Sequence, residues 1–155
     1  DRLRSRGLGD VYKRQDLESV FDKNSFDFII TNPPYKKMDT GKTNENSKKL
    51  ISRHEITATL KDFIKISYIM LKDKGTLYMV HKPERLVDII YQLRKNKIEP
   101  KEIRFVHPYE KKEPNLILIK AVKNGGQFLK IDKPLYVYNE RGEYTEEILK
   151  IYNKM

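Results

Sequence analysis

Apolar and polar positions along this chain alternate in blocks that predict strands and helices in turn. The run from Phe26 to Thr31 is nearly continuously apolar, which is typical of a strand covered on both faces. A helix that stops near Gly75 is predicted next, from apolar or small residues at helical spacing: Ile56, Leu60, Phe63, Ile64, Ser67 and Leu71. A second helix should begin near Pro83 and bury Leu86, Ile89, Ile90 and Leu93.

Three further strands complete this pattern, at Leu77 to Val80, Ile103 to Val106 and Leu116 to Val122. Alternating strands and helices predict parallel strands joined by right-handed crossovers. The link His107 to Pro114 is too short for such a crossover, so the last strand should run antiparallel to the one before it. Beyond it, Tyr136 and Tyr138 suggest an extended segment. A final helix that docks on the domain is expected from its cap and apolar residues, Thr145, Ile148, Leu149 and Tyr152.

The tetrapeptide Asn32-Pro33-Pro34-Tyr35 directly follows the first predicted strand. Asn32 offers a side-chain oxygen and Pro33 a carbonyl oxygen, and two such acceptors can hold both N–H bonds of a planar amine and aim its lone pair at a methyl donor. Pro34 restricts Pro33 to an extended conformation, and the Tyr35 ring offers a face on which a base can stack. The alternative is a simple turn, since Asn and Pro both favour turns.

Composition limits the possible classes of protein. The 155 residues suffice for one domain with a core, and no stretch is long enough to span a membrane. The chain has no cysteine, which excludes disulfides and thiolate metal sites and is compatible with a cytoplasmic setting. A net charge of +10 favours an acidic partner such as nucleic acid, although a Lys- and Glu-rich surface can also reflect genomic base bias.

The segment 1–15 differs from the rest because it shows no apolar period. Its end, from Arg6 to Gln15, resembles translated adaptor sequence of the kind left on assembled sequencing reads. We therefore expect residues 1–15 to be non-native and residues 16–155 to form the domain.

Much of Phe26 to Met155 resembles the bacterial adenine N6-methyltransferases that modify valine tRNA beside the anticodon. The resemblance is carried by the segments Phe26 to Tyr35, Arg53 to Ile56, His81 to Leu86, Pro100 to Val106 and Pro134 to Asn139. It implies methyl transfer from S-adenosylmethionine to N6 of an adenine in tRNA, and a monomeric intact enzyme. The implied fold class is α/β, the C-terminal half of a class I methyltransferase (Rossmann-like) sheet, with three parallel strands, one antiparallel strand and flanking helices.

The cofactor site departs from that family pattern. The glycine-rich cofactor turn of the family would precede residue 16, and Gly7-Leu8-Gly9 has no strand before it and no helix after it. The chain therefore resembles the substrate-side half of such an enzyme and is expected to be inactive alone. Within it, the resemblance places Asn32 beside the methyl donor, and Asp16 either contacts the donor or caps a turn or helix.

In a mostly parallel sheet, ligands bind beyond the carboxyl ends of the strands. We expect RNA phosphates to meet a basic rim there, made of Lys36, Lys37, Lys82, Arg85, Lys111 and Lys112. Each lysine taken singly also fits an ordinary solvated side chain. The polar loop from Lys36 to Ser52 either closes over a flipped base or is a plain connector.

No metal site is expected, because His54-Glu55 lacks a second histidine four residues on. His81 and His107 fall at strand ends, where packed, hydrogen-bonded roles are favoured over RNA contact. Three other functions remain open: methylation of a protein glutamine amide at N5, methylation of guanine N2 in RNA, and a noncatalytic RNA-binding fragment.

Overall fold

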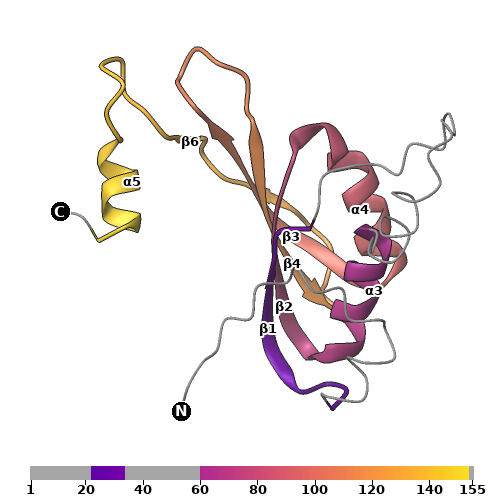
Figure 1. The fold of residues 1–155 in the computed structure, drawn as a ribbon. Coiled ribbons are helices and arrows are strands. Elements are labelled where there is room, and N and C mark those ends of the chain that lie inside the picture. Colours follow the sequence, from indigo (N-terminus) through magenta and orange to yellow (C-terminus); the bar gives the residue numbers. More distant parts are fainter. Residues whose placement is uncertain (1–21, 34–59, 154–155) are drawn as a thin grey trace, which may run out of the picture.

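A mixed β-sheet with two helices on one of its faces forms the centre of the molecule (Figure 1). The computed structural model of the chain describes residues 22–33 and 60–153. The strands are β1 (Phe26–Thr31), β2 (Leu71–His81), β3 (Ile98–His107), β4 (Leu116–Lys123), β5 (Lys130–Ile131) and β6 (Leu135–Tyr136). The helices are α3 (Leu60–Met70), the 3-10 turn η1 (Pro83–Arg85), α4 (Leu86–Lys95) and α5 (Glu146–Ile151).

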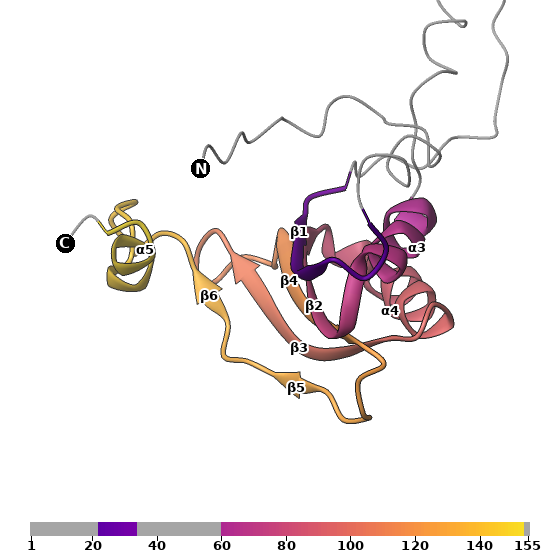
Figure 2. The ribbon, with the colours of Figure 1, turned by 90° about the horizontal axis from the view of Figure 1, so that it is seen from below.

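The order of the main strands across the sheet is β1-β2-β4-β3 (Figure 2). β1 runs parallel to β2, and β4 runs antiparallel to both β2 and β3. The three parallel strands and the one antiparallel strand expected from the sequence are therefore confirmed. The short link after β3 returns the chain as a hairpin, which places β4 between β2 and β3.

The core lies between the sheet and the helices α3 and α4. The predicted inward stripe of α4 is confirmed, because Ile89 and Leu93 are completely buried and Leu86 and Ile90 pack against the same cluster. Burial of each such side chain contributes about 1.5–3 kcal/mol to folding. The other buried members of this cluster are Ile64, Leu71, Leu77, Met79, Ile98, Ile103, Ile117, Ile119 and Ala121.

The expectation that Leu71 belongs to the first helix is wrong, because α3 ends at Met70 and Leu71 opens β2. The last carbonyl groups of a helix need partners from outside it. Here the backbone N–H groups of Asn24 and Ser25 donate to the oxygens of Ile69 and Met70, each at 3.0 Å. The Lys123 ammonium donates to the oxygens of Tyr68 and Leu71, each at 2.7 Å. Partners distant in sequence therefore fix where the helix ends.

The residues that follow Leu71 leave the regular pairing with β1. Phe26 is paired with Leu71 and Phe28 with Thr76, so residues 72–75 form an irregularity of the ladder. Lys72 reaches back across this irregularity, and its ammonium lies 2.8 Å from the Asp27 carboxylate. The strand β2 thus starts at Leu71, six residues before the predicted start at Leu77.

The expectation that the first strand is covered on both faces is also wrong. Ile29 packs against the core on the helical face, whereas Phe28 and Ile30 are 60% and 64% exposed. Tyr78 of the neighbouring strand is 40% exposed. The strand β1 is therefore buried on one face only, although apolar side chains lie on both of its faces.

After β4 the chain returns along β3, where β5 and β6 pair with it one after the other (Figure 2). The Lys101 ammonium donates to three main-chain oxygens of the returning segment, those of Gly126, Gln127 and Phe128, at 2.9, 2.7 and 2.9 Å. Arg104 donates to the oxygen of Lys133 at 2.9 Å. Two basic side chains of β3 thus hold this segment by its backbone.

The final helix α5 forms as predicted. The Thr145 hydroxyl accepts a hydrogen bond from the Ile148 N–H at 3.4 Å and donates to the Tyr136 oxygen at 2.7 Å. Ile148 is 6% exposed and packs with Val106 and Leu135, which confirms that the helix docks on the domain.

Candidate functional site

Asn32 lies at the carboxyl end of β1, between two buried neighbours. Thr31 is 5% exposed and Pro33 is fully buried, whereas Asn32 is exposed. Proline has no N–H to continue the ladder, and it restricts the preceding residue to an extended conformation. The buried ring of Pro33 therefore anchors the chain, and the Asn32 amide is the exposed group of the three.

The adjoining strand β2 ends in His81, which is 1% exposed. Its Nδ1 accepts a hydrogen bond from the Lys82 N–H at 2.8 Å, so the predicted packed, hydrogen-bonded role is confirmed. Burial, the largest cause, lowers the pKa of His81 from 6.5, and the nearby Arg85 guanidinium lowers it further. The ring is therefore neutral at pH 7, and its burial keeps it from contact with RNA.

The basic residues of the expected rim divide into two groups. Lys82 and Arg85 follow β2, next to the strand that carries Asn32, while Lys111 and Lys112 lie in the exposed hairpin after β3. Because β1, β2 and β3 are parallel, all four residues lie at the same edge of the sheet. The Arg85 Nε lies 2.8 Å from the Asp88 carboxylate, so this ion pair already neutralises part of the Arg85 charge.

Several candidate residues lie outside the described part of the chain, and their roles stay predictions. They are Asp16, Pro34, Tyr35, Lys36 and Lys37, together with the segment 1–15, the loop from Lys36 to Ser52, Ile56 and the pair His54-Glu55.

Within residues 22–33 and 60–153, no group of three or more His, Asp or Glu side chains is arranged to hold a metal ion. The His107 Nδ1 instead lies 2.7 Å from the Lys112 oxygen, and its ring contacts that of Tyr136. Among the same residues, no helix has the length and apolar character needed to cross a bilayer.

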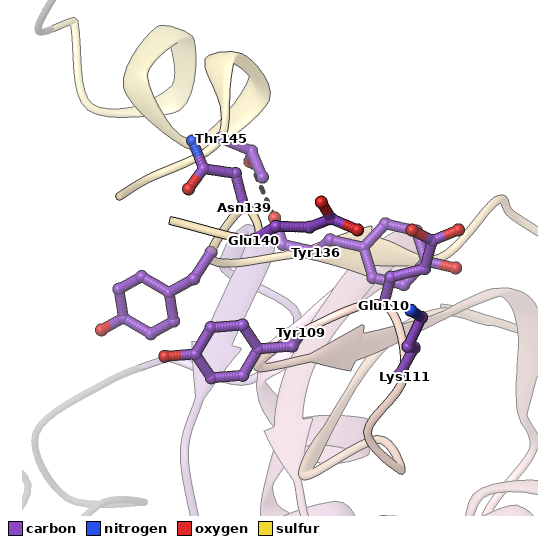
Figure 3. Close-up of a pocket in the computed structure, with 8 residues that line it drawn as sticks. Tyr109, Glu110, Lys111, Tyr136, Asn139, Glu140 and Thr145 are labelled. Carbon is purple, nitrogen blue, oxygen red and sulfur yellow. Dashed lines mark hydrogen bonds between the residues drawn. The ribbon is translucent and has the colours of Figure 1, made fainter. Parts of the chain in front are cut away.

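The sequence did not indicate a cavity of about 540 Å³ that lies between the β3–β4 hairpin and the segment after β6 (Figure 3). Tyr109 comes from the hairpin, Tyr136 from β6 and Tyr138 from the segment after it, and Glu110, Lys111 and Glu140 supply charged groups. The tyrosines are far apart in the chain, and β6 brings them together by pairing with the end of β3. The sequence feature that pointed to this region was the alternation of Tyr136 and Tyr138, which indicates an extended segment.

The tyrosine rings of this region form a continuous row of ring contacts, in which one pair is stacked and two pairs are tilted. The centroid of Tyr138 is 5.4 Å from that of Tyr109 and 5.2 Å from that of Tyr144, with planes 14° apart in the second pair. Tyr144 also contacts Tyr152, with ring centroids 6.4 Å apart and planes tilted by 47°. The neighbouring Tyr144 raises the pKa of Tyr138, because two phenolates at this distance would repel each other, so the Tyr138 hydroxyl stays protonated near pH 7.

Comparison with known proteins identifies the family. Residues 4–114 match the model of the Eco57I restriction-modification methylases. The chain belongs to this family. The matched region contains β1, β2, β3 and the Asn32-Pro33 corner, and it ends in the hairpin before β4.

A curated relative of this family member is the tRNA1(Val) (adenine(37)-N6)-methyltransferase of Parabacteroides distasonis. The two are 28% identical over 146 residues, which cover 91% of this chain and 59% of the relative. The chain thus spans somewhat more than half the length of that enzyme.

Solved structures agree on the fold. A predicted O-methyltransferase from Agrobacterium tumefaciens superimposes with a TM-score of 0.70 at 18% identity, over 92% of this chain and 58% of the other. A candidate DNA modification methylase from Thermus thermophilus, in complex with S-adenosyl-L-methionine, gives a TM-score of 0.51 at 17% identity, over 88% and 58% of the two chains. The expected α/β class I methyltransferase fold is confirmed.

Proposed function

We propose that this chain is the substrate-side part of an enzyme that transfers a methyl group from S-adenosylmethionine to N6 of an adenine in tRNA. The observation that carries the proposal is the corner at the end of β1, where an exposed Asn32 is followed by a fully buried proline. Support for the substrate comes from the relative that modifies tRNA and from the net charge of +10.

The corner suits the chemistry of a planar amine. The lone pair of an exocyclic amine is delocalised into its ring, so the amine must be oriented before it can attack. The side-chain oxygen of Asn32 and the carbonyl oxygen of Pro33 are acceptors for its two N–H bonds. Because Pro33 is buried and fixes its own φ, these acceptors are held in place before the substrate arrives.

The described residues fit one side of a methyl-donor site. Asn32 is exposed at the edge of the sheet where parallel strands bind their ligands, so its amide can meet both the amine and the donor. S-adenosylmethionine, when bound, supplies an electrophilic methyl carbon. The amine nitrogen forms the new C–N bond as the S–C bond breaks, and the methylated nitrogen then loses a proton to water. No strong base is needed, and the neutral, buried His81 is not in a position to act as one.

In the proposed enzyme, Tyr35 provides a stacking surface for the flipped adenine and Asp16 contacts the donor. The basic residues at the edge of the sheet bind phosphates. Among those that the structure describes, Lys111 and Lys112 are exposed and suited to this role.

Labelled S-adenosylmethionine and the full-length gene product test the proposal. The acceptors are an unmodified valine tRNA, a DNA duplex and a release factor with an unmodified glutamine, and digested RNA is analysed for its methylated nucleosides. We expect N6-methyladenosine in the tRNA. Label in DNA or protein, or N2-methylguanosine in the RNA, would contradict it in favour of another acceptor. Binding of tRNA without any transfer would indicate a noncatalytic RNA-binding protein.

A further inference from the structure

We propose that the tyrosine pocket, formed by Tyr109, Glu110, Lys111, Tyr136, Tyr138 and Glu140, binds a second unpaired nucleobase of the RNA, distinct from the adenine at Asn32. This inference rests on the proposed function, since it assigns a further contact to the same substrate. The pocket volume of about 540 Å³ is within the range of small-ligand sites.

The aromatic part of the pocket is built in advance. Tyr138 is held between Tyr109 and Tyr144, so none of the three rings has to be ordered when a ligand binds. Tyr109 ends this row of rings and is 40% exposed, which leaves ring surface open to a planar partner. Stacking on an aromatic side chain is the main way in which proteins hold unpaired bases.

The polar part of the pocket selects among the bases. Neither Glu110, Lys111 nor Glu140 forms a side-chain hydrogen bond or ion pair with another described residue, and all three are exposed. The turn that carries Glu140 is itself rigid, because the Asn139 Oδ1 accepts from the N–H groups of Arg141 and Glu143 at 2.9 and 3.0 Å. Two carboxylates are acceptors only. An exocyclic NH2 group offers them two N–H donors, whereas uracil offers only its N3–H, so the carboxylates favour bases that carry such a group. Lys111 supplies a charge for the adjoining phosphate.

A nucleobase fits this chain better than a cationic side chain does. Aromatic rings with nearby carboxylates can also hold an ammonium group. The chain, however, has a net charge of +10 and belongs to a family of nucleic-acid methylases.

The pocket lies too far from Asn32 to hold the same nucleotide. Tyr136 pairs with His107 at the carboxyl end of β3, and Asn32 follows the carboxyl end of β1, so both sites are at the same edge of the sheet. Four strand spacings separate β1 from β6, which is about 19 Å. That equals about five to six base steps of a stacked strand. Tyr136, Tyr138 and Glu140 lie beyond residue 114, where the family match ends, whereas Tyr109, Glu110 and Lys111 lie within it.

Fluorescence anisotropy with labelled hexamers of riboadenylate and ribouridylate, in the absence of methyl donor, tests the pocket. We expect the full chain to bind the adenylate hexamer about tenfold more tightly than the uridylate hexamer. Tyr109→Ala should weaken adenylate binding about tenfold, while Tyr109→Phe, which keeps the ring, should stay within about twofold of the parent. The matched control is Tyr91→Ala, which removes a 60% exposed tyrosine of α4.

Equal losses in Tyr109→Ala and Tyr91→Ala, no loss in either, or no preference for adenylate would each overturn the proposal. Competition by a trimethyl-lysine peptide that Tyr109→Ala abolishes would reassign the pocket to a cationic ligand and overturn it as well. These results are independent of the methylation assay. A protein that methylates tRNA but fails here retains its proposed function, and one that passes here without methylating tRNA loses only that function.

Discussion

The ammonium nitrogen of Lys123 lies 2.7 Å from the main-chain oxygen of Leu71, at the point where α3 gives way to β2. The same ammonium donates to the Asn24 side-chain oxygen and to the Tyr68 oxygen, each at 2.7 Å. It also lies 4.4 Å from the centroid of the Tyr68 ring. One side chain, 6% exposed, thus joins the end of β4, the end of α3 and the approach to β1.

Replacement of Lys123 by methionine should lower the free energy of unfolding by about 3 kcal/mol, because it leaves buried acceptors without a donor. Urea denaturation measures the change. Lys120→Met is the matched control, since Lys120 lies on the same strand, on the face without helices. We expect the control to change stability by less than about 0.5 kcal/mol. Equal effects of the two substitutions would show that the three hydrogen bonds contribute nothing specific.

His81 should make the fold sensitive to mild acid. Its folded pKa is lowered from 6.5, chiefly by burial, so below about pH 6.5 the unfolded chain binds a proton that the folded chain does not. This contribution to stability is therefore complete above pH 6.5 and is lost as the pH falls toward the lowered folded value. In His81→Asn the amide oxygen can still accept from the Lys82 N–H, but it does not titrate.

Denaturation midpoints measured from pH 8 to pH 5 should thus fall more steeply for the parent than for His81→Asn. The difference between the two proteins isolates His81 from the carboxylates, which titrate in both. Parallel curves would mean that His81 keeps the same pKa in the folded and unfolded chains.

Loss of the Thr145 hydroxyl should loosen α5. Thr145→Ala removes both the helix cap and the bond to the Tyr136 oxygen, at a cost of about 1 kcal/mol. Amide hydrogen exchange at Leu149 and Tyr152, whose N–H groups bond within this helix, should accelerate about fivefold. Thr145→Ser keeps the hydroxyl and should exchange at nearly the parent rate. If alanine and serine gave the same rates, the hydroxyl would not be the cap.

Asn32→Ala in the full-length enzyme should lower kcat by two to three orders of magnitude, roughly the effect of removing one orienting hydrogen-bond group from an active site. Affinity for tRNA should remain within about twofold, because the amide aligns the amine rather than holding the RNA. Single-turnover rates and filter binding separate the two effects. Near-normal turnover would remove Asn32 from its proposed role.

Lys111→Ala and Lys112→Ala should weaken RNA binding in a salt-dependent way. Each phosphate contact that is lost lowers the slope of log Kd against log salt by about 0.7 to 0.9. Lys150→Ala, in the last turn of α5, serves as the comparison for a general loss of one positive charge. An unchanged slope in both hairpin variants would exclude the hairpin from phosphate binding.

The sequence predicts the parts of this fold that depend on local patterns. The stripe that contains Ile89 and Leu93 predicts the buried side of α4, and the short link after His107 predicts the antiparallel strand. The end of α3 was beyond such reasoning, because Leu71 continues the helical spacing. What stops the helix is Lys123, Asn24 and Ser25, which approach it only in the folded chain.

The candidate site shows the same division. The Asn32-Pro33 corner follows from residue types and their place after a strand. The tyrosine pocket depends instead on β6, which is two residues long. The alternation of Tyr136 and Tyr138 indicates an extended segment there, but it does not indicate that the segment pairs with Val106 and His107. The apolar residues of β1 predicted a strand buried on both faces, and this prediction is wrong because Phe28 and Ile30 are exposed in the structure.

The segment that returns along β3 is gripped through its peptide oxygens, by Lys101 at residues 126–128 and by Arg104 at Lys133. Such contacts are blind to side-chain identity, since every residue type offers the same carbonyl. Substitutions in the returning segment therefore leave these hydrogen bonds intact and need not change its path. Substitution of Lys101 or Arg104 instead removes the donors, and the segment that leads to Tyr136 and Tyr138 loses its attachment to β3.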